Sequence, residues 1–591
     1  MRKILFLKIT EVILITWALT LVTHTSPTNI LTLLFCILAV LLTGRVSKRT
    51  VPENIKGSSY QKENLAALIC GGIFSLFYTL GDSRSWSLGL DSRLFILGIT
   101  LIGAIGLWVL FYNLLLFFFD WIDRARKGME EWGLLNGKFE NHIFGWTVLI
   151  TFTCWIPYFL YLYPGIMTPD SVNQLEQALG MIPYSNHHPV AHTLLIKSLF
   201  NLGYKITGDR NAGIAFYTIF QMAIGALTAG YAADTVKHLR MNRATLIITV
   251  VFYALLPFNG VYAVTMWKDV LFGYACLALV ITLTRIIHSG YKVAWYEYVI
   301  LAISSIVTAL FRSNGWYGFI LISLVISVYL AIIKKSRGII AVLLGAVLVA
   351  SIIRGPVFKA CHVSQPNFAE GLAVPTQQIS QVLCNDREID AEDRKLIESV
   401  VDLTYIKELY APGYSDNVKE LIKAGNEDYL IEHKGEFLKL YIKLFFKYPG
   451  DYIQAFVDQT GGYYFPEANH LVADNEGIVA NDCGVYSSPL MRGKIIVKAK
   501  EIAIKLGNMV PLYGILWSCG SILWLIIISA SYVTTNNNIR YFIVYMVPFC
   551  MVGILLLAVP VSGDYRYYYF LSLMIPVLSL LPFVNQGQSD N

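Results

Sequence analysis

Apolar stretches of about twenty residues recur along most of this 591-residue chain. A helix of roughly 20 apolar residues is long enough to cross the hydrocarbon core of a bilayer. Charged residues make up only 15% of the chain, whereas soluble domains contain roughly 25%. The sequence therefore predicts an all-α polytopic membrane protein.

The apolar pattern predicts about 14 transmembrane helices. The first could be mistaken for a signal peptide, but Lys8 and Glu11 interrupt its apolar run and no small-residue cleavage site follows, so we expect an uncleaved span. The predicted spans are residues 4–24, 28–45, 65–81, 93–120, 143–163, 212–236, 243–258, 266–287, 295–312, 315–334, 338–354, 509–530, 541–560 and 567–583.

Basic residues between the spans predict the orientation. They gather in residues 46–64, 121–142, 237–243, 285–292 and 334–337, which the positive-inside rule places in the cytoplasm. We therefore expect a multi-pass protein of the plasma membrane with both termini in the cytoplasm.

One apolar run conflicts with this orientation if it is counted as a span. A full crossing by residues 190–206 would move residues 237–243 to the outside. We therefore expect residues 190–206 to lie along the outer interface or to re-enter it without crossing.

The spans and loops divide the chain into four parts. We expect an N-terminal transmembrane extension of four spans at 1–142, a transmembrane core at 143–354 with an outer loop at 164–211, an extracytoplasmic and mostly helical domain at 355–507, and C-terminal transmembrane helices at 508–591. Residues 355–507 hold 22 of the 40 acidic residues, which favours an aqueous location. If that compartment is oxidising, a disulfide between Cys361 and Cys384 is one alternative and two free thiols are the other.

The stretch "YPGIMTPDSVNQLEQALGMIPYSNHHPVAHTLLI", residues 163–196, is unusually polar for its position between apolar segments. Thr168 suits a helix N-cap and Pro169 suits the first helical position. Asp170 then falls in the first turn, where the helix dipole favours a negative charge. Asp170 is either a simple helix cap or a functional carboxylate, since ionisable residues near membrane depth tend to be functional.

The pattern "YPG-x-x-TPDS-x-x-Q" followed by "HHPVAHTLLI" resembles the GT-C superfamily of integral-membrane glycosyltransferases. The likeness is closest to the bacterial protein-mannosyltransferase-like or RgtA-D-like branch, which uses polyprenyl-phosphate-linked sugars. It covers roughly residues 143–354 and, more loosely, the last three spans. The resemblance implies a GT-C-like core whose active site lies on the extracytoplasmic face.

By this resemblance Asp170 is the catalytic general base that takes the proton of the acceptor hydroxyl. Many members carry two acids here, whereas this chain has Asp170 followed by Ser171, so no metal ligand set is predicted. His187, His188 and His192 could suggest zinc, but no adjacent carboxylate or cysteine completes a site. We expect His188 to orient substrate. Gln174, on the predicted helix that begins near Asp170, is a further substrate-binding candidate.

Three basic residues at span ends are candidates for contacting a donor phosphate. Lys268 could do so as a point charge, or could form a local ion pair with Asp269. Arg312 and Arg566 could bind phosphate through two parallel hydrogen bonds, or could simply extend to the interface. Asp269 and Asn314, which lie next to these cations in the sequence, are further substrate-binding candidates.

The loop after residue 460 supplies weaker candidates for an acceptor cleft. Tyr463, Tyr464, Glu467 and His470 lie in its glycine- and aromatic-rich sequence. We include Tyr464 among the substrate-binding candidates.

The expected function is inverting glycosyl transfer from a polyprenyl-phosphate-linked sugar to a cell-envelope glycan or lipid-linked acceptor, without a cofactor. The expected partners are that donor, that acceptor and the lipid bilayer, with no nucleic acid. Two alternatives remain open: a polysaccharide polymerase or ligase that uses a diphosphate carrier, and a transporter or flippase of lipid-linked sugars. No inverted repeat and no matching pair of broken spans supports a transporter.

Overall fold

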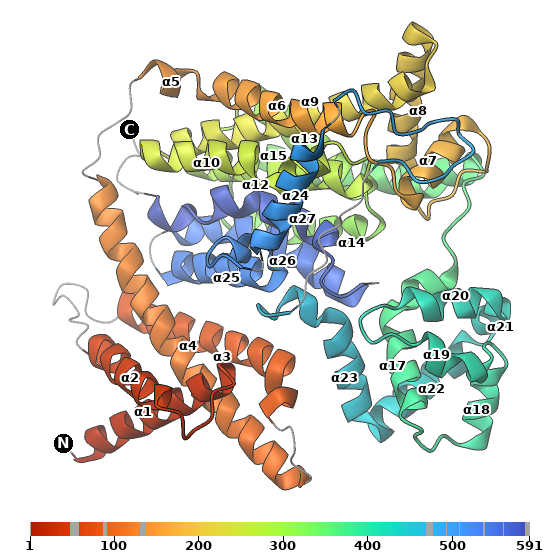
Figure 1. Cartoon of the computed structure of the whole chain (residues 1–591). Helices are drawn as coiled ribbons and strands as arrows, with labels where there is room; N and C mark the ends of the chain where they lie inside the picture. Colours follow the sequence, from red (N-terminus) through yellow and green to blue (C-terminus); the bar gives the residue numbers. More distant parts are fainter. Residues whose placement is uncertain are drawn as a thin grey trace.

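The computed structural model describes residues 2–47, 58–86, 92–130, 137–468, 477–491, 493–507, 509–535, 538–558 and 561–584. Over these residues the chain is helical, and extended structure is limited to five isolated bridges. Figure 1 shows a main helix bundle, a group of N-terminal helices beside it and a smaller helical unit at its flank. The all-α class predicted from the sequence is confirmed.

Ten helical stretches among the described residues are long and apolar enough to cross a membrane, and an eleventh is a pair bent by 49°. The bent pair is α10 (Arg243–Leu255) with α11 (Pro257–Ala263). The ten stretches contain α1 (Arg2–Val22), α3 (Ser58–Trp86), α4 (Arg93–Glu130), α6 (Ile143–Tyr161), α9 (Arg210–His238), α12 (Lys268–His288), α14 (Ser313–Ile332), α15 (Arg337–Ile352), α26 (Phe542–Leu557) and α27 (Tyr565–Leu578). The chain is thus a multi-pass integral membrane protein.

Three predicted spans correspond to shorter apolar helices. These are α2 (Leu31–Ser47), α13 (Trp295–Leu310) and α25 (Cys519–Thr535), of 17, 16 and 17 residues. The structure therefore supports ten to eleven spans by length and composition, and the count of fourteen stays a prediction.

Helix α12 lies at the centre of the bundle. In its most apolar 18-residue stretch 94% of the residues are buried, because α9, α13, α26 and α27 pack around it. Gly225 of α9 and Gly273 of α12 leave room for aromatic and aliphatic side chains of their neighbours at these contacts. A helix that is apolar on every side belongs in such a fully enclosed position.

The bundle has two chemically different ends. At one end Arg285 of α12 pairs with Asp234 of α9 at 2.8 Å and with Glu297 of α13 at 3.4 Å. The predicted cytoplasmic loops 237–243 and 285–292 lie at this end. Lys268, the first residue of α12, lies at the opposite end.

Helix α8 (Val190–Thr207) stays at the end where α12 begins. Its start contacts α9 through a 2.6 Å hydrogen bond between His192 and Tyr217, and its end brings Gly203 against Gly213. Both contacts fall within the first part of α9, so α8 does not run the length of the bundle. This agrees with the prediction that residues 190–206 do not cross.

The N-terminal helices and the flanking unit have hydrophobic cores of their own. Helices α1 to α4 join the bundle through α25, where Tyr532 packs among them. The flanking unit has a separate buried core. It comprises α17 (Ala373–Cys384), α18 (Ala391–Glu398), α19 (Ile406–Leu409), α20 (Asp416–Ala424), α21 (Glu427–Glu432), α22 (Lys434–Lys447) and α23 (Pro449–Thr460).

The predicted domain at 355–507 contains more than this one unit. After η5 (Gly461–Tyr463), residues 477–491 fold back against the outer loop of the bundle, and α24 (Lys494–Gly507) packs on η6 (Gly514–Trp517). Cys361 and Cys384 are both free thiols in the structure.

Candidate functional site

The segment before α7 (Pro169–Leu179) is held between two other parts of the chain. Ile166 donates to the carbonyl of Val264 at 2.8 Å, and its own carbonyl accepts from Met266 at 2.9 Å. On the other side Met167 donates to Gly477 at 3.0 Å. These bonds bring the starts of α7 and α12 side by side, although about 100 residues separate them in sequence.

The start of α7 is capped as the sequence predicts. Thr168 is the N-cap, Pro169 is the first helical residue and Asp170 lies in the first turn. The indole N–H of Trp267 donates to the Thr168 hydroxyl at 2.8 Å, and the Ser171 hydroxyl donates to the carbonyl of Met266 at 2.6 Å. Most of α7 is buried against its neighbours.

Four helix N-termini meet at this point. Helices α7, α12 and α27 begin here, with Asp170, Asp269 and Arg566 at their second positions, and α14 begins after Arg312. Each N-terminus carries unpaired N–H groups and a partial positive charge. The side chains and the backbone therefore both favour an anion.

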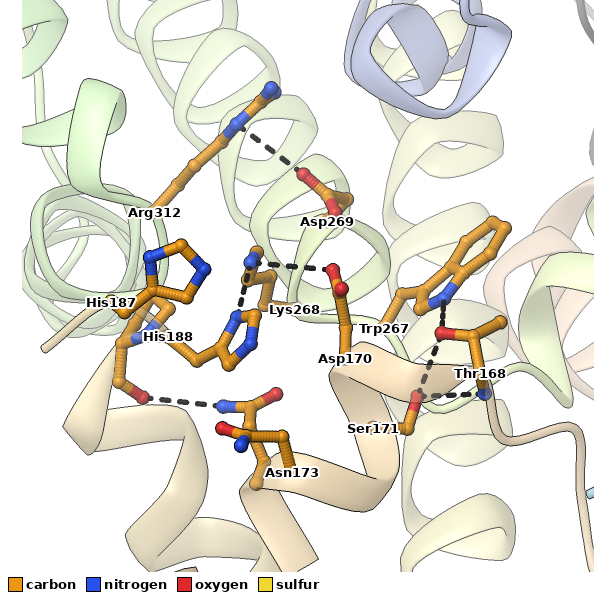
Figure 2. Close-up of polar contacts among 12 residues, drawn as sticks. Thr168, Asp170, Ser171, Asn173, His187, His188, Trp267, Lys268, Asp269 and Arg312 are labelled. Carbon is orange, nitrogen blue, oxygen red and sulfur yellow. Dashed lines mark hydrogen bonds and ion pairs between the residues drawn. The ribbon is translucent and has the colours of Figure 1, made fainter. Parts of the chain in front are cut away.

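Asp170 is the more exposed of the two carboxylates. Its Oδ2 atom accepts a hydrogen bond from Nη2 of Arg566 at 2.6 Å and lies 3.6 Å from Nζ of Lys268. Nζ of Lys268 also donates to Nδ1 of His188 at 2.9 Å. Figure 2 shows Lys268 between the carboxylate of Asp170 and the ring of His188. The Asp170 side chain is 35% exposed, so a ligand can approach it.

Asp269 is the buried counterpart, with its side chain only 2% exposed. Its Oδ2 accepts from Nε of Arg566 at 2.7 Å. Its Oδ1 lies 3.3 Å from Nε of Arg312, a pair that Figure 2 shows. The local pair between Lys268 and Asp269 is not formed, because consecutive residues at a helix start point in different directions. Arg312 does not extend to the interface either, since it is buried and also donates to the carbonyl of Tyr567.

The cations determine the protonation of the groups outside the spans. Burial alone raises the pKa of the Asp170 carboxyl, but Lys268 and Arg566 outweigh it and hold the pKa well below its usual range. Burial, and then the charge of Lys268, lowers the pKa of His188 to about 2. Asp170 is therefore ionised and His188 neutral at physiological pH.

Two aromatic residues complete the site, and no distinctive sequence pattern predicts their role. The guanidinium of Arg566 lies 4.5 Å from the ring centroid of Trp267, and that of Arg312 lies 4.7 Å from the ring centroid of Tyr567. Such stacking fixes the plane of an arginine and adds cation–π attraction. Each aromatic residue is adjacent in sequence to a cluster residue, which is the one clue available beforehand.

Gln174 and His192 lie beneath the cluster and hold α7 in place. The buried Gln174 amide contacts Nδ1 of His192 and the Thr193 hydroxyl, both at 3.0 Å. The other ring nitrogen of His192 contacts the Tyr217 hydroxyl, which donates to Oε1 of Gln221. The amide nitrogen of Gln221 in turn donates to three backbone carbonyls that precede α12. The structure thus gives Gln174 a positioning contact and leaves its predicted contact with substrate untested.

The remaining candidates lie apart from the charged cluster. Asn314 is in the first turn of α14 and partly exposed. Tyr464 is buried, with its ring 4.9 Å from that of Phe77 of α3. Within the described ranges it has no contact with the cluster. His470 lies outside the described residues.

The histidines of the loop go to separate partners. His187 lies 3.9 Å from Glu370, while His188 contacts Lys268 and His192 is buried with Gln174. In the part of the chain that the structure describes, no group of three or more His, Cys, Asp or Glu side chains could hold a metal ion.

One protein family matches nearly the whole length of the chain. Residues 16–591 match a family described as a family of unknown function, DUF6020. No curated protein and no solved structure matches the chain. Because the family match covers far more than half of the 591 residues, the chain belongs to the DUF6020 family.

Proposed function

We propose that this protein is an inverting membrane glycosyltransferase of GT-C type. It takes a sugar from a polyprenyl-phosphate carrier and passes it to a hydroxyl of an extracytoplasmic cell-envelope glycan or lipid-linked acceptor. One observation carries the proposal: the half-buried Asp170 lies against Lys268 and Arg566 where four helix N-termini meet. The fourteen-span GT-C-like arrangement, with this site on the outer face, is part of the proposal.

The cluster suits a phosphate leaving group. Three cations, Lys268, Arg312 and Arg566, gather here beside the carboxylates of Asp170 and Asp269. A third carboxylate, Asp564, caps α27 and accepts from the backbone N–H of Arg566. Preorganised charges and helix N-termini stabilise the negative charge that develops on a departing phosphate. Removal from bulk water strengthens these interactions.

Asp170 supplies the base that the reaction needs. The oxygen of the acceptor hydroxyl attacks the anomeric carbon and forms a new C–O bond, while the bond from that carbon to the phosphate oxygen breaks. The phosphate keeps the bonding electrons, and the hydroxyl proton passes to Asp170. One displacement inverts the anomeric carbon, so a second carboxylate acting as nucleophile is not required.

The two cluster carboxylates have different roles in this proposal. Asp269 is buried and holds the guanidinium groups of Arg312 and Arg566 in place. Asp170 is exposed enough to reach an acceptor. His188, which is neutral, keeps the Lys268 ammonium group directed toward the donor.

The Asp170→Asn variant tests the proposed role directly. The substitution keeps the size of the side chain and removes the base. Membranes carrying each variant are supplied with labelled polyprenyl-phosphate sugar and native envelope acceptor. We expect transfer to fall at least about 100-fold, in line with loss of a general base, while donor binding persists.

Glu176→Gln is the matched control, because Glu176 lies on the same helix and takes no part in the cluster. Its transfer rate should equal that of the wild type. Normal transfer by Asp170→Asn would show that Asp170 is only a helix cap. A parallel arm with a diphosphate-linked sugar distinguishes the alternative polymerase or ligase, which would use that donor instead.

A further inference from the structure

The helical unit at the flank of the bundle contains an apolar cavity. It has a volume of about 380 Å³ and lies between α17, α18, α20 and α22. The face of α17 that lines it runs through Thr376, Ile379 and Leu383, at the spacing of one helical stripe. The volume is about 2.5 times that of an engineered cavity of roughly 150 Å³ that binds benzene, and it falls within the range of ligand sites.

Two of the few polar groups in the wall are paired within the unit. The Thr376 hydroxyl donates to the carbonyl of Leu372 at 2.8 Å, within its own helix. The Tyr441 hydroxyl donates to Oε1 of Gln378 at 2.5 Å. A ligand inside the cavity therefore meets almost only hydrocarbon. An apolar chain fits this wall, whereas a sugar or nucleotide would lose its hydrogen bonds to water.

The mouth of the cavity combines apolar and basic groups. Phe368 and Leu438 line it and are 40% and 58% exposed. Lys434, the first residue of α22, also lines the cavity and is exposed. No ion-pair partner of Lys434 is described among residues 137–468, so its charge is available to an anionic headgroup.

The surface of α22 leads away from this mouth as an exposed apolar stripe. Leu438, Ile442, Phe445 and Phe446 repeat at helical spacing, and their exposed fractions range from 41% to 77%. Lysines flank the stripe along the same helix. Such basic amphipathic helices are typical of the lipid–water interface, which makes lipid the natural source of an apolar chain here.

We propose that this cavity binds the hydrocarbon chain of a single-chain lipid whose anionic headgroup pairs with Lys434. The unit that holds the cavity also contacts the outer loop of the bundle through η3 (Phe368–Leu372). Phe368 and Leu372 of η3 line the cavity, while Glu370 between them lies 3.9 Å from His187 of the outer loop. The inference stands on binding alone and does not require the proposed sugar transfer.

Photolabelling of the full chain in lipid nanodiscs tests this site. The probe is a 16-carbon fatty acid with a diazirine at mid-chain, and labelled residues are located by mass spectrometry. We expect labels in α17, α20 and α22. Unlabelled palmitate and an unlabelled polyprenyl phosphate serve as competitors, and the stronger competitor identifies the source of the chain.

Two variants distinguish the cavity from general lipid contact. Lys434→Gln should reduce labelling about fivefold, the size of one exposed ion pair, whereas Lys439→Gln on the same helix should not. Ser380→Leu fills space at the wall and should abolish cavity labelling while keeping or raising the unfolding temperature.

The proposal is overturned if labels fall only outside α17, α20 and α22, or if Lys434→Gln and Lys439→Gln reduce labelling equally. It is also overturned if Ser380→Leu is labelled like the wild type. Should Ser380→Leu not fold, competition on the wild type decides. Saturable competition supports the site, and labelling that neither competitor reduces refutes it.

Discussion

Replacement of Asp269 by asparagine should destabilise the protein more than any other single change of charge in the cluster. The side chain is 2% exposed and lies 2.7 Å from Arg566 and 3.3 Å from Arg312. Asparagine keeps the shape but removes the charge. Two buried guanidinium groups then lose the carboxylate that they share, although Arg566 keeps its contact with Asp170.

The expected loss of folding stability follows from the burial of Asp269. Removing one partner of a buried ion pair costs about 3–5 kcal/mol, because an uncompensated charge stays in a medium of low dielectric constant. The matched change Asp170→Asn affects a side chain that is 35% exposed, where water replaces the lost interaction. That change should cost about 1 kcal/mol or less.

Reversible unfolding in mixed micelles, followed by circular dichroism, measures both variants against the wild type. A double-mutant cycle of Asp269→Asn with Arg312→Gln should give a coupling free energy of about 1–3 kcal/mol, because the two side chains are in direct contact. If Asp269→Asn costs no more than Asp170→Asn, the division into a structural and an accessible carboxylate is wrong.

Two further changes probe the surroundings of the site. His188 stays neutral in the folded state because its pKa is lowered to about 2, but it takes up a proton on unfolding below its ordinary pKa of roughly 6.5, so stability falls as the pH drops. His188→Gln should remove about 1–2 kcal/mol of the stability loss between pH 7 and pH 5, and equal pH profiles for both proteins would contradict the burial of His188. Gly462→Ala places a methyl group on the backbone of Gly563, which precedes α27, and should cost about 1–3 kcal/mol in the same unfolding assay, whereas Gly435→Ala has open space and should cost less than about 0.5 kcal/mol.

The helical membrane fold follows from local signals in the sequence. Apolar runs and basic loops are contiguous, so each span can be recognised without knowing its neighbours. The basic residues after α9 also predict that residues 190–206 do not cross, and α8 contacts only the first part of α9. The lengths of α2, α13 and α25 could not be predicted from the sequence, because hydropathy does not locate the turns that end a helix.

The site could be predicted as a set of residues and not as a set of contacts. Asp170, Lys268, Arg312 and Arg566 stood out because each is charged at the end of an apolar segment. Their pairing joins positions as far as 396 residues apart, which only the tertiary structure brings together. The prediction that Tyr464 binds substrate rests on local composition alone, and burial against α3 separates this residue from the cluster.

The ion pairs of Asp170 place a requirement on the proposed reaction. A carboxylate held by Lys268 and Arg566 is a weak base, because both cations favour its ionised form. In the proposed reaction a donor phosphate competes for the charge of those same cations, so Asp170 loses part of their stabilisation and becomes more basic. Asp269 is buried between Arg312 and Arg566 and holds both guanidinium groups in place for the phosphate. The proposed reaction thus couples binding of the donor to activation of the base, which one exposed and one buried carboxylate serve better than two equivalent ones.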